Sequence, residues 1–315
     1  MASIGQCRKK GVVPDRIAAD LMSGQAQAVG VVNLPAIAAR QRRPWNKRLL
    51  VGVAIILLVA GVAVGAPWIA PYSPEYQELT IRLKGPTGAH LLGTDNYGRD
   101  LLSRVIWGSR VSLAVGLLSM SIAVSVGVFI GATSGYFGGA VDAVLMRLTE
   151  LMLVFPAFFL LILIVATFGR SVTMLVFMLG FTSWAVSARI IRGEVLKVKE
   201  RDYILATHSI GASSSRIILL HVLPNIVSVI IVSATVRVGV LILVEAGLSF
   251  LGLGIQEPMS SWGSMISAGA LYMRQAWWFA TFPGVAIFMT VLGFNLLGEG
   301  LRDILDPRQG TGRVV

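Results

Sequence analysis

The sequence has one cysteine and few charged side chains. The single cysteine, Cys7, excludes a disulfide within the chain, so nothing here points to an oxidising compartment. Charged residues make up 14% of the chain and hydrophobic residues 55%, whereas soluble domains carry about 25% and about 45–50%. The shortage of charge excludes an ordinary soluble domain and predicts a membrane protein.

Motifs of several catalytic classes are also missing. No Gly-Lys pair occurs, so the chain lacks a GxxxxGK[ST] phosphate-binding loop. Its three histidines, His90, His208 and His221, are scattered and suggest neither a metal site nor a catalytic set. We therefore expect a non-catalytic chain with no metal and no cofactor of its own.

Basic residues are in excess and unevenly placed. The formal net charge is +11, and nine of the 27 Lys and Arg lie in residues 1–48 beside two acids. Nucleic-acid binding would explain this excess, but the positive-inside rule produces the same basic flanks beside apolar spans. We favour the second interpretation and expect membrane lipid, not nucleic acid, as a partner.

Long apolar runs predict an all-α, polytopic membrane protein. The first run can cross about 30 Å of hydrocarbon, and its long basic leader does not fit a cleaved signal peptide. Backbone amides have no water partner in lipid, so each run is predicted to be a helix. The six predicted spans are Leu49–Ala70, Val111–Thr133, Val144–Phe168, Val172–Ala188, Ile226–Leu253 and Phe279–Gly298.

The positions of Lys and Arg predict the orientation. With the N-terminus inside, the inner segments hold nineteen basic residues and the outer ones seven. We therefore place both termini in the cytoplasm. The predicted parts are a partly disordered cytoplasmic tail (1–48), a first span (49–70), an external segment (71–110), a core of five spans (111–301) with a cytoplasmic loop (189–224), and a cytoplasmic tail (302–315).

Small residues and one proline predict features inside the spans. Gly116, Gly127 and Gly131 favour close helix contacts, because lipid offers no hydrophobic drive for helix association. Pro156 predicts a kink in the third span.

The basic loop 189–224 predicts two short helices. The first runs from Asp202, a plausible N-cap, and stops at Gly211; the second begins near Ser213 or Ser214 and continues to Leu223. Tyr203, Ala206 and Ile210 then share one face of the first helix. Such a helix could dock into a groove on a soluble partner or lie on anionic lipid, and the pattern alone leaves both open.

This loop resembles the cytoplasmic loop that marks permeases of bacterial ATP-binding-cassette importers. The match lies in Ala206, Gly211, Leu223 and Pro224 at the expected spacing, and the sequence departs from the signature at Leu205, Thr207 and His221. The resemblance implies contact with an ATPase. The residues assigned to this coupling role are Asp202, Tyr203, Ala206, Thr207, Ile210, Gly211, Ala212, Leu223 and Pro224.

Three longer stretches, His90–Gly116, Glu245–Gly269 and Phe282–Arg308, resemble the second, C-type permease of dipeptide, oligopeptide and nickel importers. The family implies a type I importer permease fold in a bacterial inner membrane. It also implies a second homologous permease, two ATPase subunits that bind ATP and Mg²⁺, and an external substrate-binding protein. Peptide is the expected solute, with glutathione or a nickel chelate as the alternatives.

Two charged residues fall inside the fifth span, where burying charge is costly. Arg237 and Glu245 could line a translocation path, or each could reach a partner on a neighbouring helix; we favour the second interpretation. Trp262, Trp277 and Trp278 fit a membrane-interface belt, and a contact with the binding protein is the second interpretation. The run Asp95, Arg99, Asp100 is interpreted as a helix start with Asp95 as its cap.

Two functions of other classes do not fit the sequence. A secondary transporter should show an internal repeat with broken helices at matching positions, and none is visible in the sequence. An intramembrane protease needs paired catalytic groups within its spans, such as Ser with His or two Asp residues, and the predicted spans contain no such pair.

Overall fold

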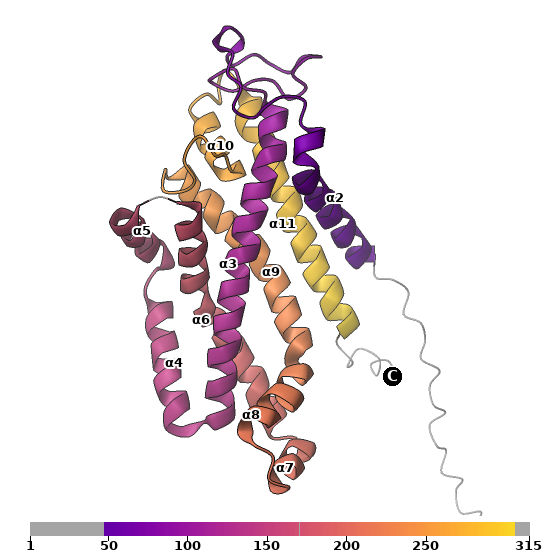
Figure 1. Cartoon of the computed structure of the whole chain (residues 1–315), viewed down its shortest axis with the longest axis vertical. Helices are drawn as coiled ribbons and strands as arrows, with labels where there is room; N and C mark the ends of the chain where they lie inside the picture. The colour runs from indigo at the N-terminus through magenta and orange to yellow at the C-terminus, as the bar shows by residue number, and fades with distance from the viewer. Residues whose placement is uncertain (1–46, 170, 306–315) are drawn as a thin grey trace, which may run out of the picture. The chain divides into compact units, whose positions relative to one another are not determined.

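The computed structural model describes residues 47–169 and 171–305. The predicted tails 1–48 and 302–315 lie largely outside this part of the chain. Within it the regular elements are helices, with one isolated bridge between Thr94 and Asp100 (Figure 1), as the all-α prediction requires. The elements are α2 (Lys47–Ile69), η1 (Leu79–Ile81), α3 (Leu101–Phe137), α4 (Gly139–Val154), α5 (Ala157–Phe168), α6 (Val172–Lys199), α7 (Asp202–Ser209), α8 (Ser214–Ile217), η2 (Ile218–Val222), α9 (Leu223–Phe250), α10 (Trp262–Ala270) and α11 (Trp277–Leu305).

Five helices of the described part are long and apolar enough to cross a membrane. They are α2, α3, α6, α11 and the continuous stretch from α8 through α9. The predicted third span is a bent pair, α4 and α5, whose axes meet at 86°. Counting that pair as one span gives the six that the sequence predicts.

Pro156 lies at the break between α4 and α5. It takes the N-cap position of α5, and Phe155 caps the end of α4 in an extended conformation. Proline cannot donate a backbone hydrogen bond and pushes the preceding residue out of the helical region. The predicted kink is confirmed, and it is sharp enough to make two helices.

Several helices extend beyond the predicted spans. Helix α3 begins at Leu101 instead of Val111, because Asp100 caps it by accepting a bond from the Ser103 amide at 2.8 Å. The prediction that Asp95 caps this helix is wrong, and the non-helical segment after α2 is shorter than 71–110. Helix α6 likewise continues to Lys199, so the first part of the predicted loop 189–224 is helical.

Helices α3 and α6 make the most extensive pair contact in the described chain. A Cβ on Gly127 would lie 2.5 Å from the Ser187 Cβ, and one on Gly131 would lie 2.5 Å from the Ala188 carbonyl oxygen. Further along, Gly135 faces Val195. These three glycines, each four residues from the next, therefore let the two backbones approach closely, as small residues do in membrane helices. We call this contact, at Gly127, Gly131 and Gly135, the α3–α6 seam.

A second group of helices packs around α11. Helix α2 lies along it, with Gly52 against the backbone at Leu297 and Gly300 against Leu49. Helix α9 contacts both α11 and α3, and Gly116 of α3 faces Ile242 of α9. Helix α9 thus joins the α3–α6 pair to the α2–α11 pair.

We predict that Gly131→Val destabilises the protein. The added side chain meets the α6 backbone, and overpacking of this kind lowers the free energy of unfolding by about 1–3 kcal/mol. The matched control is Gly61→Val in α2, where an added Cβ meets nothing within 4 Å. Thermal unfolding in lipid nanodiscs measures both variants, and equal midpoints for the two would contradict the proposed seam.

Candidate functional site

The segment between α6 and α9 folds into the two predicted short helices. Helix α7 begins at Asp202, with Arg201 in the N-cap position, so Asp202 is the first helical residue and does not cap the helix. Its carboxylate still lies in the first turn, where negative charge is favourable. The helix ends at Ser209 with Ile210 as its C-cap, and Gly211 follows with φ +84°, a conformation that glycine adopts without strain.

Helix α7 is anchored on one side and open on the other. Ile204 is 3% exposed and packs with Ile217 and Val222 in a cluster that also includes the ends of α3 and α6. Tyr203 is 41% exposed and Ile210 84% exposed, and Ala206 on the same face is also exposed. Removing this apolar face from water requires an occupant other than the described chain.

The remaining assigned residues lie around this face. Thr207 is partly buried and donates its hydroxyl to the Tyr203 carbonyl at 2.7 Å. Ala212 is partly buried against the cluster under α7. Leu205, which stands where the family signature has Glu, is 55% exposed.

No loop separates α8 from α9. Residues Ser214–Phe250 form one continuous stretch, with a π-helical turn at Ile218–Val222 just before Pro224. Proline cannot donate the bond that an α-helix needs at that position, and a wider turn is one way to accommodate the missing donor. The Asn225 side chain donates to the His221 carbonyl at 2.6 Å. The segment that carries α7 is therefore connected to α9 by the helical elements α8 and η2.

Glu245 of α9 is fully buried and bonded to a neighbouring element. Its Oε1 accepts hydrogen bonds from Ser249 at 2.8 Å and from Ser261 at 2.7 Å. Ser261 is the N-cap of α10. Glu245 therefore ties α10 to α9, in agreement with the partner interpretation, while its Oε2 has no hydrogen-bond partner in the described chain.

Arg237, two turns earlier on α9, is only partly buried. Its guanidinium has no ion pair or hydrogen bond to the residues that the structure describes, so the favoured interpretation of a partner on a neighbouring helix finds no support there, and the role in a path stays a prediction. Arg147 and Glu150, predicted as a local pair on α4, do form an exposed ion pair at 3.2 Å.

The three tryptophans assigned to partner contact differ in exposure. Trp262 is 2% exposed and donates its indole N–H to the Val105 carbonyl at 2.9 Å. Trp278 is 8% exposed and donates to the Thr94 carbonyl at 3.3 Å. Neither ring offers a surface to a partner in this structure, because Trp262 is held against α3 and Trp278 against the segment that precedes α3. The expectation is corrected for these two and rests on Trp277, which is 54% exposed.

A buried charge cluster at the start of α3 was missed by sequence reasoning. Asp95 is 0% exposed, and its Oδ1 accepts the amides of Tyr97 and Arg99. Its Oδ2 accepts from Arg99 Nε at 2.6 Å and Arg104 Nη1 at 2.5 Å. The spacing of Asp95, Arg99 and Arg104 was the sequence feature that could have indicated this cluster, but we interpreted Asp95 as a helix cap.

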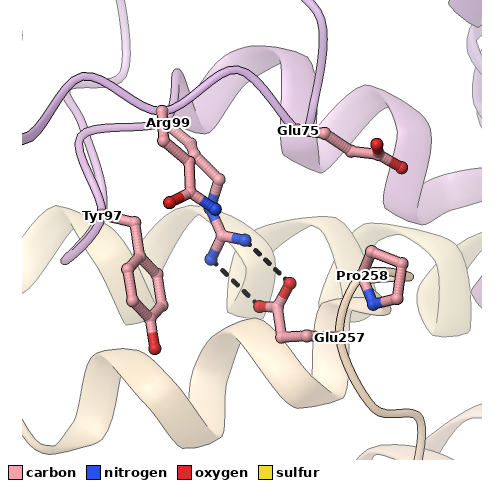
Figure 2. Close-up of a pocket in the computed structure, with 6 residues that line it drawn as sticks. Glu75, Tyr97, Arg99, Glu257 and Pro258 are labelled. Atoms are coloured by element: carbon pink, nitrogen blue, oxygen red, sulfur yellow. Dashed lines mark hydrogen bonds and ion pairs between the residues drawn. The ribbon is translucent and has the colours of Figure 1, made fainter.

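Glu257, from the segment between α9 and α10, completes the cluster. Its carboxylate accepts from Arg99 at 2.7 and 3.0 Å and from Arg104 at 3.0 Å. Figure 2 shows the Arg99 guanidinium and this carboxylate facing each other. They stand 158 positions apart in the sequence, so no local pattern could have paired them.

A cavity of about 380 Å³ opens beside this ion pair. Its lining combines acidic, amide, aromatic and guanidinium groups. The lining residues are Glu75, Gln77, Tyr97, Arg99, Glu257 and Pro258. Two of these lining residues, Tyr97 and Arg99, directly precede the start of α3, whereas helix α7 lies near the other end of α3 (Figure 1).

Comparisons with known proteins agree on one family. Residues 127–311 match the model described as "Binding-protein-dependent transport system inner membrane component". Residues 45–86 match "N-terminal TM domain of oligopeptide transport permease C".

Relatives with curated names cover nearly the whole chain. The oligopeptide transport system permease protein OppC of Haemophilus influenzae is 40% identical over 86% of this chain and 88% of its own length. The probable D,D-dipeptide transport system permease protein DdpC of Escherichia coli is 40% identical over 81% and 86%. The glutathione transport system permease protein GsiD of Pectobacterium atrosepticum is 39% identical over 88% and 96%.

We predict that Asp95→Asn destabilises the protein by about 3 kcal/mol, because it leaves two buried guanidiniums without their shared carboxylate. The matched control is Glu150→Gln, which removes one carboxylate from an exposed pair whose expected contribution is about 0–1 kcal/mol. Denaturation of the purified chain in nanodiscs compares the two variants. An Asp95→Asn change no larger than the control would show that the cluster is not a stabilising element.

Proposed function

Since this chain belongs to the family of binding-protein-dependent transport system inner membrane components, we propose that it is the permease subunit through which an ATP-driven importer takes up short peptides. The chain supplies membrane-spanning helices and a docking helix. A second homologous permease completes the path, and an external binding protein delivers the solute.

ATP is bound and hydrolysed, with Mg²⁺, by two partner ATPases and not by this chain. The absence of a GxxxxGK[ST] loop from the sequence supports this division. The orientation that fits it has both termini and α7 in the cytoplasm of a bacterial cell, with the protein in the inner membrane. The distribution of Lys and Arg, nineteen against seven, supports that orientation.

The proposal rests on the exposed apolar face of α7, whose other side is buried through Ile204. An amphipathic helix with apolar residues on its free side fits a groove on a soluble partner. Tyr203, Ala206 and Ile210 would enter that groove, while Ile204 holds α7 to the ends of α3 and α6. The resemblance to the coupling-loop signature supports an ATPase as this partner.

The same packing suggests how movement reaches the membrane. A displaced α7 moves the cluster under it, which includes Tyr136 of α3, Val195 of α6 and Ile226 of α9. Because α8 runs without a loop into α9, the displacement also passes along that helix. Such coupling requires that the ATPases bind the two states of the permease differently, and ATP-driven closure of the two subunits provides that difference.

Peptide is the proposed solute because two of the three relatives described above are named for oligopeptide or dipeptide transport. The third is named for glutathione, which is itself a small peptide. Competition for uptake among a dipeptide, glutathione and a nickel chelate separates these solutes. Uptake that needs no ATPase would instead support a secondary transporter.

We predict that Gly211→Asp abolishes ATP-driven dipeptide uptake while the protein still inserts. The residue has φ +84°, where any side chain is strained, and it ends the docking helix. Gly193→Asp in α6 adds the same charge at a site with open space around a Cβ and no positive φ.

Uptake of a labelled dipeptide by cells, with the amount of membrane protein measured by immunoblot, tests the prediction. The control variant should keep most of the wild-type rate. Wild-type uptake by Gly211→Asp at a normal protein level would refute the role of the segment.

A further inference from the structure

The charge cluster at the α10 end of the bundle is not used in the proposed coupling. It contains two arginines that are almost fully buried, Arg99 at 5% and Arg104 at 3% exposed side chain. Asp95 holds both through one oxygen and so balances one of the two positive charges. The second positive charge is balanced by Glu257.

The two arginines form a fixed fork. Arg99 directs Nη1 and Nη2 toward Glu257, and Arg104 directs Nη2 toward the same carboxylate. Tyr97 supports the fork, because the Arg99 guanidinium carbon lies 4.7 Å from its ring centroid. Paired N–H groups in a rigid plane match the geometry of a carboxylate.

The occupant of the fork is more exposed than the fork itself. The Glu257 side chain is 52% exposed, in contrast to the buried arginines. It also forms one wall of the cavity of about 380 Å³. That volume is within the about 300–1,000 Å³ of small-molecule sites, so a carboxylate could approach the fork from the cavity when Glu257 leaves.

We propose that Arg99 and Arg104 form a carboxylate-binding site, that Glu257 is its resident occupant, and that the C-terminal carboxylate of a short peptide replaces Glu257 there. Glu257 then acts as an internal competitor that keeps the site filled between encounters. The choice of a peptide as ligand rests on the proposed function. The choice of a carboxylate rests on the fork alone.

Chemical rescue tests the site. The full chain with its co-purifying subunits is placed in lipid nanodiscs, and its thermal unfolding midpoint is measured. Glu257→Ala should lower the midpoint by about 5 °C, because two guanidiniums lose a bonded partner. Sodium acetate should restore at least half of that loss, whereas acetamide, or sodium chloride at the same ionic strength, should not.

The peptide is tested in the same assay. The dipeptide Ala-Ala should stabilise Glu257→Ala as acetate does, and its C-terminal amide should not. Wild type should respond to Ala-Ala only at a higher concentration than Glu257→Ala does, because the peptide must displace Glu257, and it should not respond to the amide. Glu75→Ala is the matched control: Glu75 lines the same cavity but has no bond to either arginine, so this variant should neither lose stability nor respond to acetate.

Each contradictory result has a distinct meaning. If acetate fails to stabilise Glu257→Ala, or Glu257→Ser where the alanine variant does not fold, the carboxylate site is refuted. Rescue by acetate without rescue by Ala-Ala overturns the peptide as ligand. None of these measurements needs ATP or transport, so a failure here is distinct from a failure of the uptake assay.

Discussion

Close contact between the backbones of α3 and α6 is the constraint on which the rest of the described structure depends. Gly127 and Gly131 allow it, because a Cβ at either position would overlap α6. With lipid on their outer faces, these helices gain little from hydrophobic burial and depend on tight packing. The ends of α3 and α6 also contribute to the apolar cluster against which Ile204 of α7 packs. Helix α7 therefore has a packed base only while α3 and α6 stay in close contact.

The polar groups at the other end follow from the cost of burying charge. Asp95, Arg99 and Arg104 are removed from water, so each needs partners nearby. Glu245 has the same requirement within α9 and meets it with two serine hydroxyls, one of them on the N-cap of α10. The bonds that Arg99 and Arg104 donate to Glu257 fix the segment between α9 and α10 against the start of α3. The end of the bundle near α10 is thus held by buried polar contacts, and the end near α7 presents an apolar face.

The sequence predicted the helical spans, the break at Pro156 and the end of α7 at Gly211, because these depend on apolar length and on local backbone rules. It did not predict the end points of α3 and α6, since a helix can extend past the membrane when a cap such as Asp100 is present. The sequence could not predict the pairing of Arg99 with Glu257, because only the tertiary fold brings the two segments together. The burial of Trp262 was missed for the same reason.

Cross-linking at Ile210 tests the central claim, that an ATPase binds the exposed face of α7, most directly. Replacing Cys7 by Ser and Ile210 by Cys leaves one cysteine in the chain, at a position that is 84% exposed on α7. The matched control places the cysteine at Leu57 of α2, which is 65% exposed. A short bifunctional reagent applied to the assembled complex should join Ile210→Cys to an ATPase subunit, with a yield that changes when ATP is added. An ATPase cross-link that forms equally from Leu57→Cys, or none from Ile210→Cys in an active complex, would contradict the account.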